Sequence, residues 1–299
     1  MNIQLRNSAD AKTGEFAFTD SDFKMISDLA KTKFGLDLQS SKKPLVYSRL
    51  AKRLRALKLS SFEAYCDMLE KTDGENEKSH LLSALTTNVT HFFRESHHFD
   101  YLHDKVVPGL CAAAKAGRPV RIWSAACSAG QEAFSIAATL YAANPDVGNL
   151  DIRILATDID PQMIAKAKAG LYPKDQSDAI PNAYRKTMLE HRSEDSMLQM
   201  APKLRDMISF AELNLIEKWP MKRRFDVIFC RNAAIYFDKP TQSTLWQDFA
   251  KNLQPGGHLM IGHSERLSGP ATQLFESVGI TTYQRHQTND ASRVTAEQE

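Results

Sequence analysis

The sequence predicts an α/β protein in which an all-helical N-terminal domain precedes a larger, doubly wound domain built on a parallel sheet. Three observations lead to this prediction. The apolar residues between positions 19 and 88 recur at helical spacing. After Gly117-Arg118-Pro119 the chain alternates short apolar runs with helical stretches. The run Val120 to Trp123 enters a loop of small residues that continues as a helix, and parallel-sheet proteins hold small cofactors in such strand–loop–helix units.

The N-terminal domain is expected over residues 19–88, after a flexible tail at residues 1–18. A linker helix region is expected at residues 89–117. Helices should begin near Thr19 or Ser21, near Pro44, near Ser60 or Ser61, and near Glu77 and Ser96. The first of them has a stop signal at Gly35, and the last is expected to be long and to end near Ala116.

The second domain is expected over residues 118–286. Strand-like runs occupy residues 119–125, 152–157, 207–212, 225–230 and 257–262, and helical stretches occupy 131–143, 161–169 and 241–253. The polar, weakly periodic segment at about residues 174–205 is expected to be an inserted subdomain. Residues 274–286 have the pattern of a helix end followed by a last strand, and residues 287–299 that of a second flexible tail.

Composition narrows the class of protein. The chain is 42% hydrophobic and 25% charged, as in ordinary globular proteins, and its net charge of +2 does not by itself indicate nucleic-acid binding. The N-terminus lacks the apolar core of a signal peptide, and no run approaches the roughly 20 apolar residues of a membrane span. We therefore expect a cytoplasmic protein. The four cysteines lie far apart, which favours reduced thiols over a zinc site: Cys66, Cys111, Cys127 and Cys230.

The small-residue loop at positions 124–130 contains one glycine, Gly130, so the pattern that brings a backbone against a pyrophosphate is absent. A nucleoside cofactor without a pyrophosphate fits better, which favours a methyltransferase over a dehydrogenase. Asp158 and Asp160 stand at the carboxyl edge of the second strand, where a carboxylate can accept both ribose hydroxyls, although an acid there can equally cap the next helix, as Asp160 can before Pro161. Glu132 can bind the cofactor's amino group or serve only as a first-turn acid stabilised by the helix dipole.

Other polar residues follow the strands or join the two domains. Asn232, after the fourth strand, can hold a substrate or cofactor through both ends of its amide. Tyr236 can form an aromatic wall or belong to the core. Arg94 lies beside two phenylalanines in the FFRE motif, where an interdomain ion pair or a capping cluster are equally good explanations. The adjacent pair His97-His98 points apart on a helix and lacks a third ligand, so no metal is expected.

Five collinear motifs carry a resemblance: TTNVTHFFRESHHF, RIWSAACSAGQEAFSIA, ATDID, FDVIFCRNAAIYFDKPTQ and PGGHLMIGHSE. Over about residues 20–285 the chain resembles the chemotaxis receptor methyltransferases, the CheR family. The resemblance implies a class I, Rossmann-like S-adenosylmethionine-dependent methyltransferase domain. It also implies transfer of the methyl group to glutamate side chains of chemoreceptor cytoplasmic helices, with S-adenosylhomocysteine as the second product.

The resemblance also assigns residues. It implies cofactor contacts from Asn88, Thr90, Arg94, Glu132, Asp158, Asn214, Leu215, Arg231 and Asn232. It places Arg94 and Tyr236 at the reacting centre. The chain departs from the family where Gln131-Glu132 stands for two glutamates and Ala129 for a threonine or serine. The stretch HRSEDSMLQM lacks the glycine of family members that grip a receptor's C-terminal pentapeptide, so we expect receptor binding without that grip, by a monomer.

The helix near residues 44–58 is strongly basic. Residues 41–60 contain seven Lys or Arg and no Asp or Glu. Helical spacing places Arg49, Lys52 and Arg53 on one stripe. Such a stripe is commonly only a solvated face, but in this family it is a candidate docking surface for acidic receptor helices.

Two other functions stay open at this stage. An RNA methyltransferase on the same fold would use the basic helix for phosphates, and would bind RNA with a steep salt dependence. A non-enzymatic module that binds the cofactor without transferring its methyl group is suggested by the altered loop at Gln131.

Overall fold

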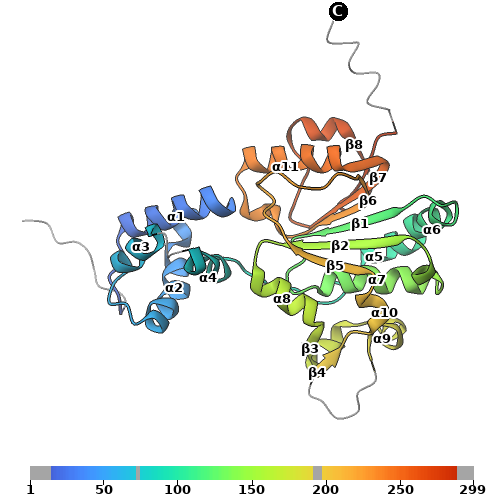
Figure 1. Cartoon of the computed structure of the whole chain (residues 1–299). Helices are drawn as coiled ribbons and strands as arrows, with labels where there is room; N and C mark the ends of the chain where they lie inside the picture. The colour runs from blue at the N-terminus through green and yellow to red at the C-terminus, as the bar shows by residue number, and fades with distance from the viewer. Residues whose placement is uncertain (1–14, 72–74, 191–196, 288–299) are drawn as a thin grey trace, which may run out of the picture. The chain divides into compact units, whose positions relative to one another are not determined.

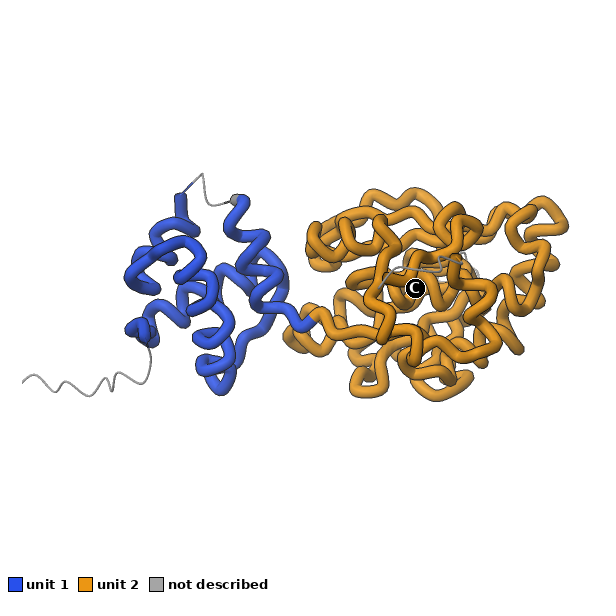
Figure 2. The backbone as a smooth tube through the Cα atoms, turned by 90° about the horizontal axis from the view of Figure 1, so that it is seen from below, with its two compact units in different colours: residues 1–87 blue, residues 88–299 orange. Residues whose placement is uncertain are grey.

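The computed structural model describes residues 15–71, 75–190 and 197–287. It divides the chain into two compact units, residues 1–87 and residues 88–299 (Figure 2). Of the two expected tails, residues 1–14 and 288–299 lie outside the described part of the chain.

The first unit is all helical. It consists of α1 (Asp20–Phe34), η1 (Ser40–Lys42), α2 (Lys43–Leu57), α3 (Phe62–Glu70) and α4 (Glu75–Leu85). α1 begins at a capping box, in which the Thr19 hydroxyl accepts the Asp22 N–H and the Asp22 carboxylate accepts the Thr19 N–H. It ends at Gly35, whose φ of 76° suits a residue without a side chain.

The structure describes this unit from residue 15, which lies within the tail predicted at residues 1–18. The ring of Phe18 packs on Phe62 with 4.2 Å between centroids, and Phe16 meets Phe62 edge-on. The backbone N–H of Phe16 also donates to the Tyr47 hydroxyl. These aromatic residues therefore close one end of the helical core.

The second unit is built on a seven-stranded sheet with the order β5-β2-β1-β6-β7-β9-β8. Its strands are β1 (Val120–Ala125), β2 (Ile152–Asp158), β5 (Ile208–Glu212), β6 (Phe225–Cys230), β7 (Leu253–Ile261), β8 (Phe275–Gly279) and β9 (Thr282–Arg285). The five strands from β5 to β7 are parallel, and β9 and β8 are antiparallel additions. The chain order runs outward in both directions from β1, so the carboxyl end of β1 lies at the switch point where such sheets bind ligands.

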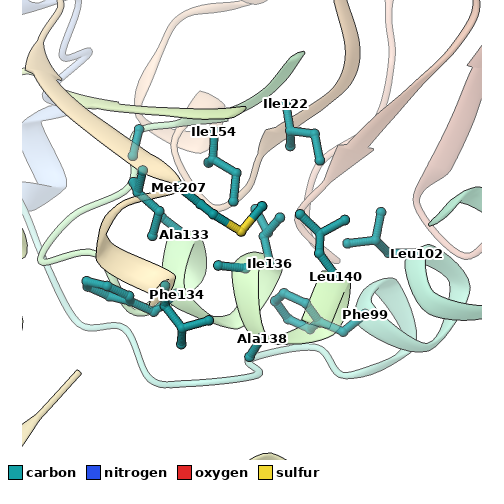
Figure 3. Close-up of a cluster of buried hydrophobic side chains, with 14 of the residues drawn as sticks. Phe99, Leu102, Ile122, Ala133, Phe134, Ile136, Ala138, Leu140, Ile154 and Met207 are labelled. Atoms are coloured by element: carbon teal, nitrogen blue, oxygen red, sulfur yellow. The ribbon is translucent and has the colours of Figure 1, made fainter. Parts of the chain in front are cut away.

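Helices cover both faces of this sheet, with α7 (Gln131–Ala143) on one and α11 (Lys239–Asn252) on the other (Figure 1). Ile122 of β1 and Ile154 of β2 face Ile136 and Leu140 of α7 in one buried cluster (Figure 3). A second cluster joins the other face of the sheet to α11. The predicted α/β class is confirmed.

The long helix predicted from about Ser96 to Ala116 is built in three parts. α5 (His97–Tyr101) continues through η3 (Leu102–Val106), which has π-helical hydrogen bonding, into α6 (Val107–Lys115). Pro108, in the first turn of α6, has no N–H to donate to the preceding turn, which fits the irregularity there.

The inserted subdomain begins a few residues before the predicted position 174. After α8 (Pro161–Ala169) it contains β3 (Leu171–Pro173), η5 (Lys174–Ala179), α9 (Asn182–Met188), β4 (Met197–Gln199) and α10 (Pro202–Arg205). β3 and β4 form a two-stranded antiparallel sheet. Residues 191–196 of HRSEDSMLQM, on which the pentapeptide expectation partly rests, lie outside the described residues.

The helix end expected at the start of residues 274–286 is present, because the 3₁₀ helix η7 (Gly269–Leu274) ends at Leu274, but two strands follow it where one was expected. Residues 275–279 form strand β8, which pairs antiparallel with β9 through a tight turn. Thr281, with φ of 46°, takes the left-handed conformation that this turn requires. Glycine and asparagine are the residues usually found in that conformation in hairpin turns. Among the described residues, no helix has both the length and the apolar character needed to cross a bilayer.

Candidate functional site

The carboxyl ends of β1 and β2 hold a loop shaped by one carboxylate. Asp158 accepts the N–H of Ser128 at 2.7 Å and the N–H of Asp160 at 2.9 Å, one on each oxygen. The loop turns through left-handed residues at Ala126 and Ser128, with φ of 63° and 50°. Burial raises the pKa of Asp158 to about 6, although the backbone hydrogen bonds favour its ionised form.

Gly130 lets α8 approach the end of this loop. Its φ is 95°, and a Cβ there would lie 2.9 Å from the Cβ of Ala167. The hydroxyl of Tyr172, on β3, donates to the Ala129 carbonyl at 2.6 Å. The inserted subdomain thus holds the loop through this hydrogen bond.

Asn88, the first residue of the second unit, joins the same loop. Its side-chain amide donates to the Asp160 carboxylate at 3.1 Å, and its carbonyl accepts the Ser128 hydroxyl at 3.2 Å. Two more predicted site residues follow Asn88 in the motif TTNVTHFFRESHHF, Thr90 and Arg94. Thr90 is half-buried. The Arg94 guanidinium donates to the Val89 carbonyl at 3.1 Å and is half-exposed.

Glu132, in the first turn of α7, interacts with side chains from β1 and from the end of β6. The Ser124 hydroxyl of β1 donates to it at 2.7 Å, and Nη1 of Arg231, which follows β6, lies 3.3 Å from its other oxygen. Burial raises the pKa of Glu132, while the charge of Arg231 opposes that rise. Arg231 Nη2 also donates to the Arg94 carbonyl, which links the FFRE motif to the end of β6.

Glu95 is a residue of this network that the sequence analysis missed. Its Oε2 lies 3.5 Å from Nη2 of Arg231, and its Oε1 accepts from His263 Nδ1 at 2.9 Å and Asn232 Nδ2 at 3.3 Å. Burial alone raises the pKa of Glu95, but the His263 hydrogen bond and the Arg231 charge outweigh it and lower the pKa to about 2. The one feature of the sequence that could have pointed to Glu95 is its position directly after Arg94 in the FFRE motif.

Glu265 is the second missed residue, and it shapes the loop after β6. Its carboxylate accepts the backbone N–H groups of four residues, two of them at 3.0 Å: Asn232, Ala233, Ile235 and Gly262. The loop carries Asn232, at φ 58°, and leads into η6 (Ala234–Tyr236). In the sequence, Glu265 is the last residue of the motif PGGHLMIGHSE.

The remaining cofactor candidates follow β5. The Leu213 N–H donates to the Asp158 carbonyl at 3.0 Å, so the chain leaves β5 beside Asp158. Asn214 then caps a turn by accepting the Ile216 N–H, and Leu215 packs at the edge of the α11 cluster. Tyr236 is half-buried in η6, in the same loop as Asn232.

The basic stripe of the first unit is mostly engaged within that unit. Arg53 forms a two-point ion pair with Glu77 of α4, at 2.7 and 2.5 Å. Arg49 donates to the carbonyls of Leu85 and Thr86. Only Lys52 of the three predicted docking residues is exposed, because the other two point toward α4.

One group of side chains has metal-ligand chemistry. Ligand atoms of Glu95, His97 and His98 lie within 4.8 Å of one another, which the helical spacing of adjacent histidines did not predict. The positive charge of Arg231 faces the same carboxylate, 3.5 Å away, and opposes a bound cation. Burial lowers the pKa of His98 to about 3, so this histidine is neutral. We keep the expectation that no metal is needed.

The chain matches models of a known protein family over both of its units. Residues 88–284 match the model of the CheR methyltransferase, SAM binding domain, and residues 21–86 match the model of its all-alpha domain. The chain belongs to the CheR methyltransferase family. It is an S-adenosylmethionine-dependent methyltransferase with the two-domain organisation of that family.

CheR relatives span nearly the whole chain. A probable chemotaxis protein methyltransferase of Rhizobium etli is 48% identical over 251 residues, 83% of this chain and 94% of the relative. Chemotaxis protein methyltransferase 2 of Pseudomonas aeruginosa is 39% identical over 90% of this chain and 94% of its own length. The chemotaxis protein methyltransferase of Escherichia coli is 36% identical, over 91% and 93%.

The residues at the strand ends suit the CheR cofactor. Two carboxylates with little exposure lie at these strand ends, Asp158 and Glu132, and carboxylates can accept hydrogen bonds from hydroxyl and ammonium groups. Gly130 leaves the turn after β1 without a Cβ, and the loop before it carries only small side chains. Several buried polar atoms here have no hydrogen-bond partner among the described residues, among them Gln131 Oε1, Arg231 Nε and Glu95 Oε2, so polar groups remain to be satisfied here.

Proposed function

We propose that this protein methylates glutamate side chains on the cytoplasmic helices of chemoreceptors, and so acts in the cytoplasm to set chemotactic adaptation. The network of Glu132, Arg231, Glu95 and Asn232 at the ends of β1 and β6 carries this proposal. Glu95, with its pKa near 2, is a poor proton acceptor. A carboxylate acceptor suits such a site, because its methylation releases no proton.

Alignment should supply most of the rate. The unperturbed pKa of glutamate is about 4.3, so the acceptor is already ionised at neutral pH. S-adenosylmethionine supplies an activated methyl group on a sulfonium. We propose that Asp158 and Glu132 hold the cofactor with Asn88, Thr90, Asn214, Leu215, Arg231 and Asn232. Arg94 and Tyr236 position the cofactor and the acceptor, so that the acceptor oxygen lies about 3 Å from the methyl carbon, and they exclude water; Arg94 does so without an ion pair to the acceptor carboxylate.

A labelling experiment tests this function. Calorimetry should show 1:1 binding of S-adenosylmethionine, and methyl-labelled cofactor should transfer label to receptor-containing membranes as a base-labile ester. Binding without transfer to receptors would support a module that only holds the cofactor. Transfer to RNA, with binding that weakens steeply with salt, would support the RNA methyltransferase.

We propose that α2 docks on the receptor mainly through Lys52. Among the basic residues that line a pocket on α2, Lys52 is exposed, whereas Arg49 and Arg53 are half-buried. Surface ion pairs contribute a few tenths of a kcal/mol each and steer the encounter. Arg53 belongs to a nearly buried pair with Glu77, whose side chain is 7% exposed, and therefore serves folding as well.

Lys52→Glu is expected to raise the KM for receptor about three- to fivefold, because it removes one attraction and adds one repulsion. The dissociation constant for S-adenosylmethionine should not change. Arg53→Glu should instead lower the free energy of unfolding by about 3–5 kcal/mol, since Glu77 would face a like charge. The exposed Lys115 of α6 offers the matched control, Lys115→Glu. An equal loss for Lys115→Glu, or none for Lys52→Glu, contradicts docking through α2.

We propose that receptor binding does not use the C-terminal pentapeptide. The proposal is supported by the missing glycine in the stretch that follows α9. Titration with a receptor C-terminal peptide should give no saturable binding up to millimolar peptide. Micromolar affinity would contradict it.

A further inference from the structure

The guanidinium of Arg231 is held between two carboxylates. Nη1 lies 3.3 Å from Glu132 Oε2, and Nη2 lies 3.5 Å from Glu95 Oε2. All three side chains are close to fully buried, with 3%, 12% and 11% of their surfaces exposed for Arg231, Glu132 and Glu95. Charges act strongly on one another in such surroundings because little water screens them.

Glu95 stands on the side of Arg231 that leads to solvent. Its second oxygen, Oε1, accepts hydrogen bonds from Asn232 and from His263, whose side chain is 64% exposed. The backbone of Glu95 is left-handed, with φ of 56°, as is that of Phe93, at 52°. This conformation is unfavourable for residues with side chains, so the surrounding contacts hold the carboxylate in place.

We propose that Glu95 is a positioning residue for methyl transfer: it neutralises Arg231 on the open side of the network and so prevents the guanidinium from pairing with the acceptor carboxylate. This inference rests on the proposed function, since it presumes an anionic glutamate as acceptor.

The chemistry explains why such neutralisation helps. In the transfer one acceptor oxygen forms the new O–C bond while the C–S bond breaks, its electron pair stays on sulfur, and no proton moves. The negative charge of the acceptor therefore shrinks on the way to the transition state. A guanidinium free to pair with the acceptor would stabilise the ground state more than the transition state, and would slow the reaction.

Glu95→Gln tests this role because glutamine keeps the shape of the side chain and removes its charge. We expect kcat to fall about tenfold and the KM for a receptor cytoplasmic fragment to fall as well, because the freed guanidinium would bind the acceptor carboxylate in the ground state. Glu95→Asp restores the charge, so its receptor KM should return to the wild-type value even though its shorter side chain keeps kcat below normal. Glu276→Gln, on the exposed face of β8, is the matched control and should behave as wild type.

A merely structural role predicts a different pattern. If Glu95→Gln raises the receptor KM as kcat falls, or if Glu95→Asp matches Glu95→Gln in both constants, the inference is overturned. Should Glu95→Gln fail to fold in thermal unfolding, Glu95→Asp alone decides: a lower kcat at unchanged receptor KM supports the inference, and a raised KM overturns it. Failure of the proposed function would appear earlier, as absent label transfer to receptors by the wild-type protein.

Discussion

Asp158→Asn is expected to weaken the binding of S-adenosylmethionine by about 100-fold or more, because charge-assisted hydrogen bonds to a buried group contribute about 1.5–3 kcal/mol each. The carboxylate uses one oxygen for the N–H of Ser128 and the other for that of Asp160. Asparagine has one acceptor oxygen, so its amide nitrogen would face one of these donors. The variant therefore loses both the ribose contact and the loop that surrounds it. Calorimetry measures the change.

The pH profile of the wild-type protein provides a second check on Asp158. With its pKa raised to about 6 by burial, the free protein holds this carboxyl protonated below that pH. The ribose hydroxyls bind the ionised form. The dissociation constant should therefore be constant above about pH 6 and rise about tenfold for each unit below it.

Asp158→Asn should lose this pH dependence. The exposed Asp151, next to the opposite end of β2, provides the control Asp151→Asn, which should keep both the affinity and the profile. A profile of the wild-type protein that stays flat to pH 5, or an affinity of Asp158→Asn within threefold of wild type, contradicts the assignment.

Gly262→Ala is expected to lower methyl transfer by about 100-fold while the protein stays folded. A Cβ at Gly262 would lie 2.5 Å from the side-chain nitrogen of Asn232, 2.7 Å from its backbone nitrogen and 2.9 Å from Glu265 Oε2. These distances are too short for real contacts, so the loop carrying Asn232 and Tyr236 must move. Displacing reacting groups by about 1 Å commonly lowers rates by that factor.

Two further variants distinguish a displaced loop from a general loss of activity on substitution. Glu265→Gln should have a comparable effect on kcat, because an amide nitrogen would face the backbone N–H groups that the carboxylate now accepts. Gly109→Ala, in α6, adds a Cβ with no neighbour within 4 Å and should leave kcat unchanged. Activity of Gly262→Ala within threefold of the Gly109→Ala control would show that the loop accommodates the added Cβ, and would contradict the prediction.

The parallel core was predictable because its strands are short apolar runs that helical stretches separate. β6 (Phe225–Cys230) was predicted with both of its ends correct, since every residue in it is buried. The hairpin of β8 and β9 was not, because its turn depends on Thr281 in a left-handed conformation that the residue type does not favour.

From the residues alone, candidates for the site could be named where a side chain ends a strand or begins a helix. Asp158 and Glu132 have that signature. The role of Glu95 depends on His263 and Asn232, which lie 168 and 137 positions away in the sequence. Helical spacing likewise placed Arg53 on a basic stripe, but it could not reveal Glu77 opposite it, which turns that arginine inward.

The position of Asn88 sets a limit on how the two units can be separated by genetic truncation. Because both its amide and its carbonyl fasten the turn beside Asp160, a chain cut to begin after residue 88 would lose that fastening together with the helices. A shortened protein that starts upstream of this asparagine keeps it. Catalytic fragments of this enzyme should therefore be designed from the sequence TTNV onward rather than from the first turn of α5.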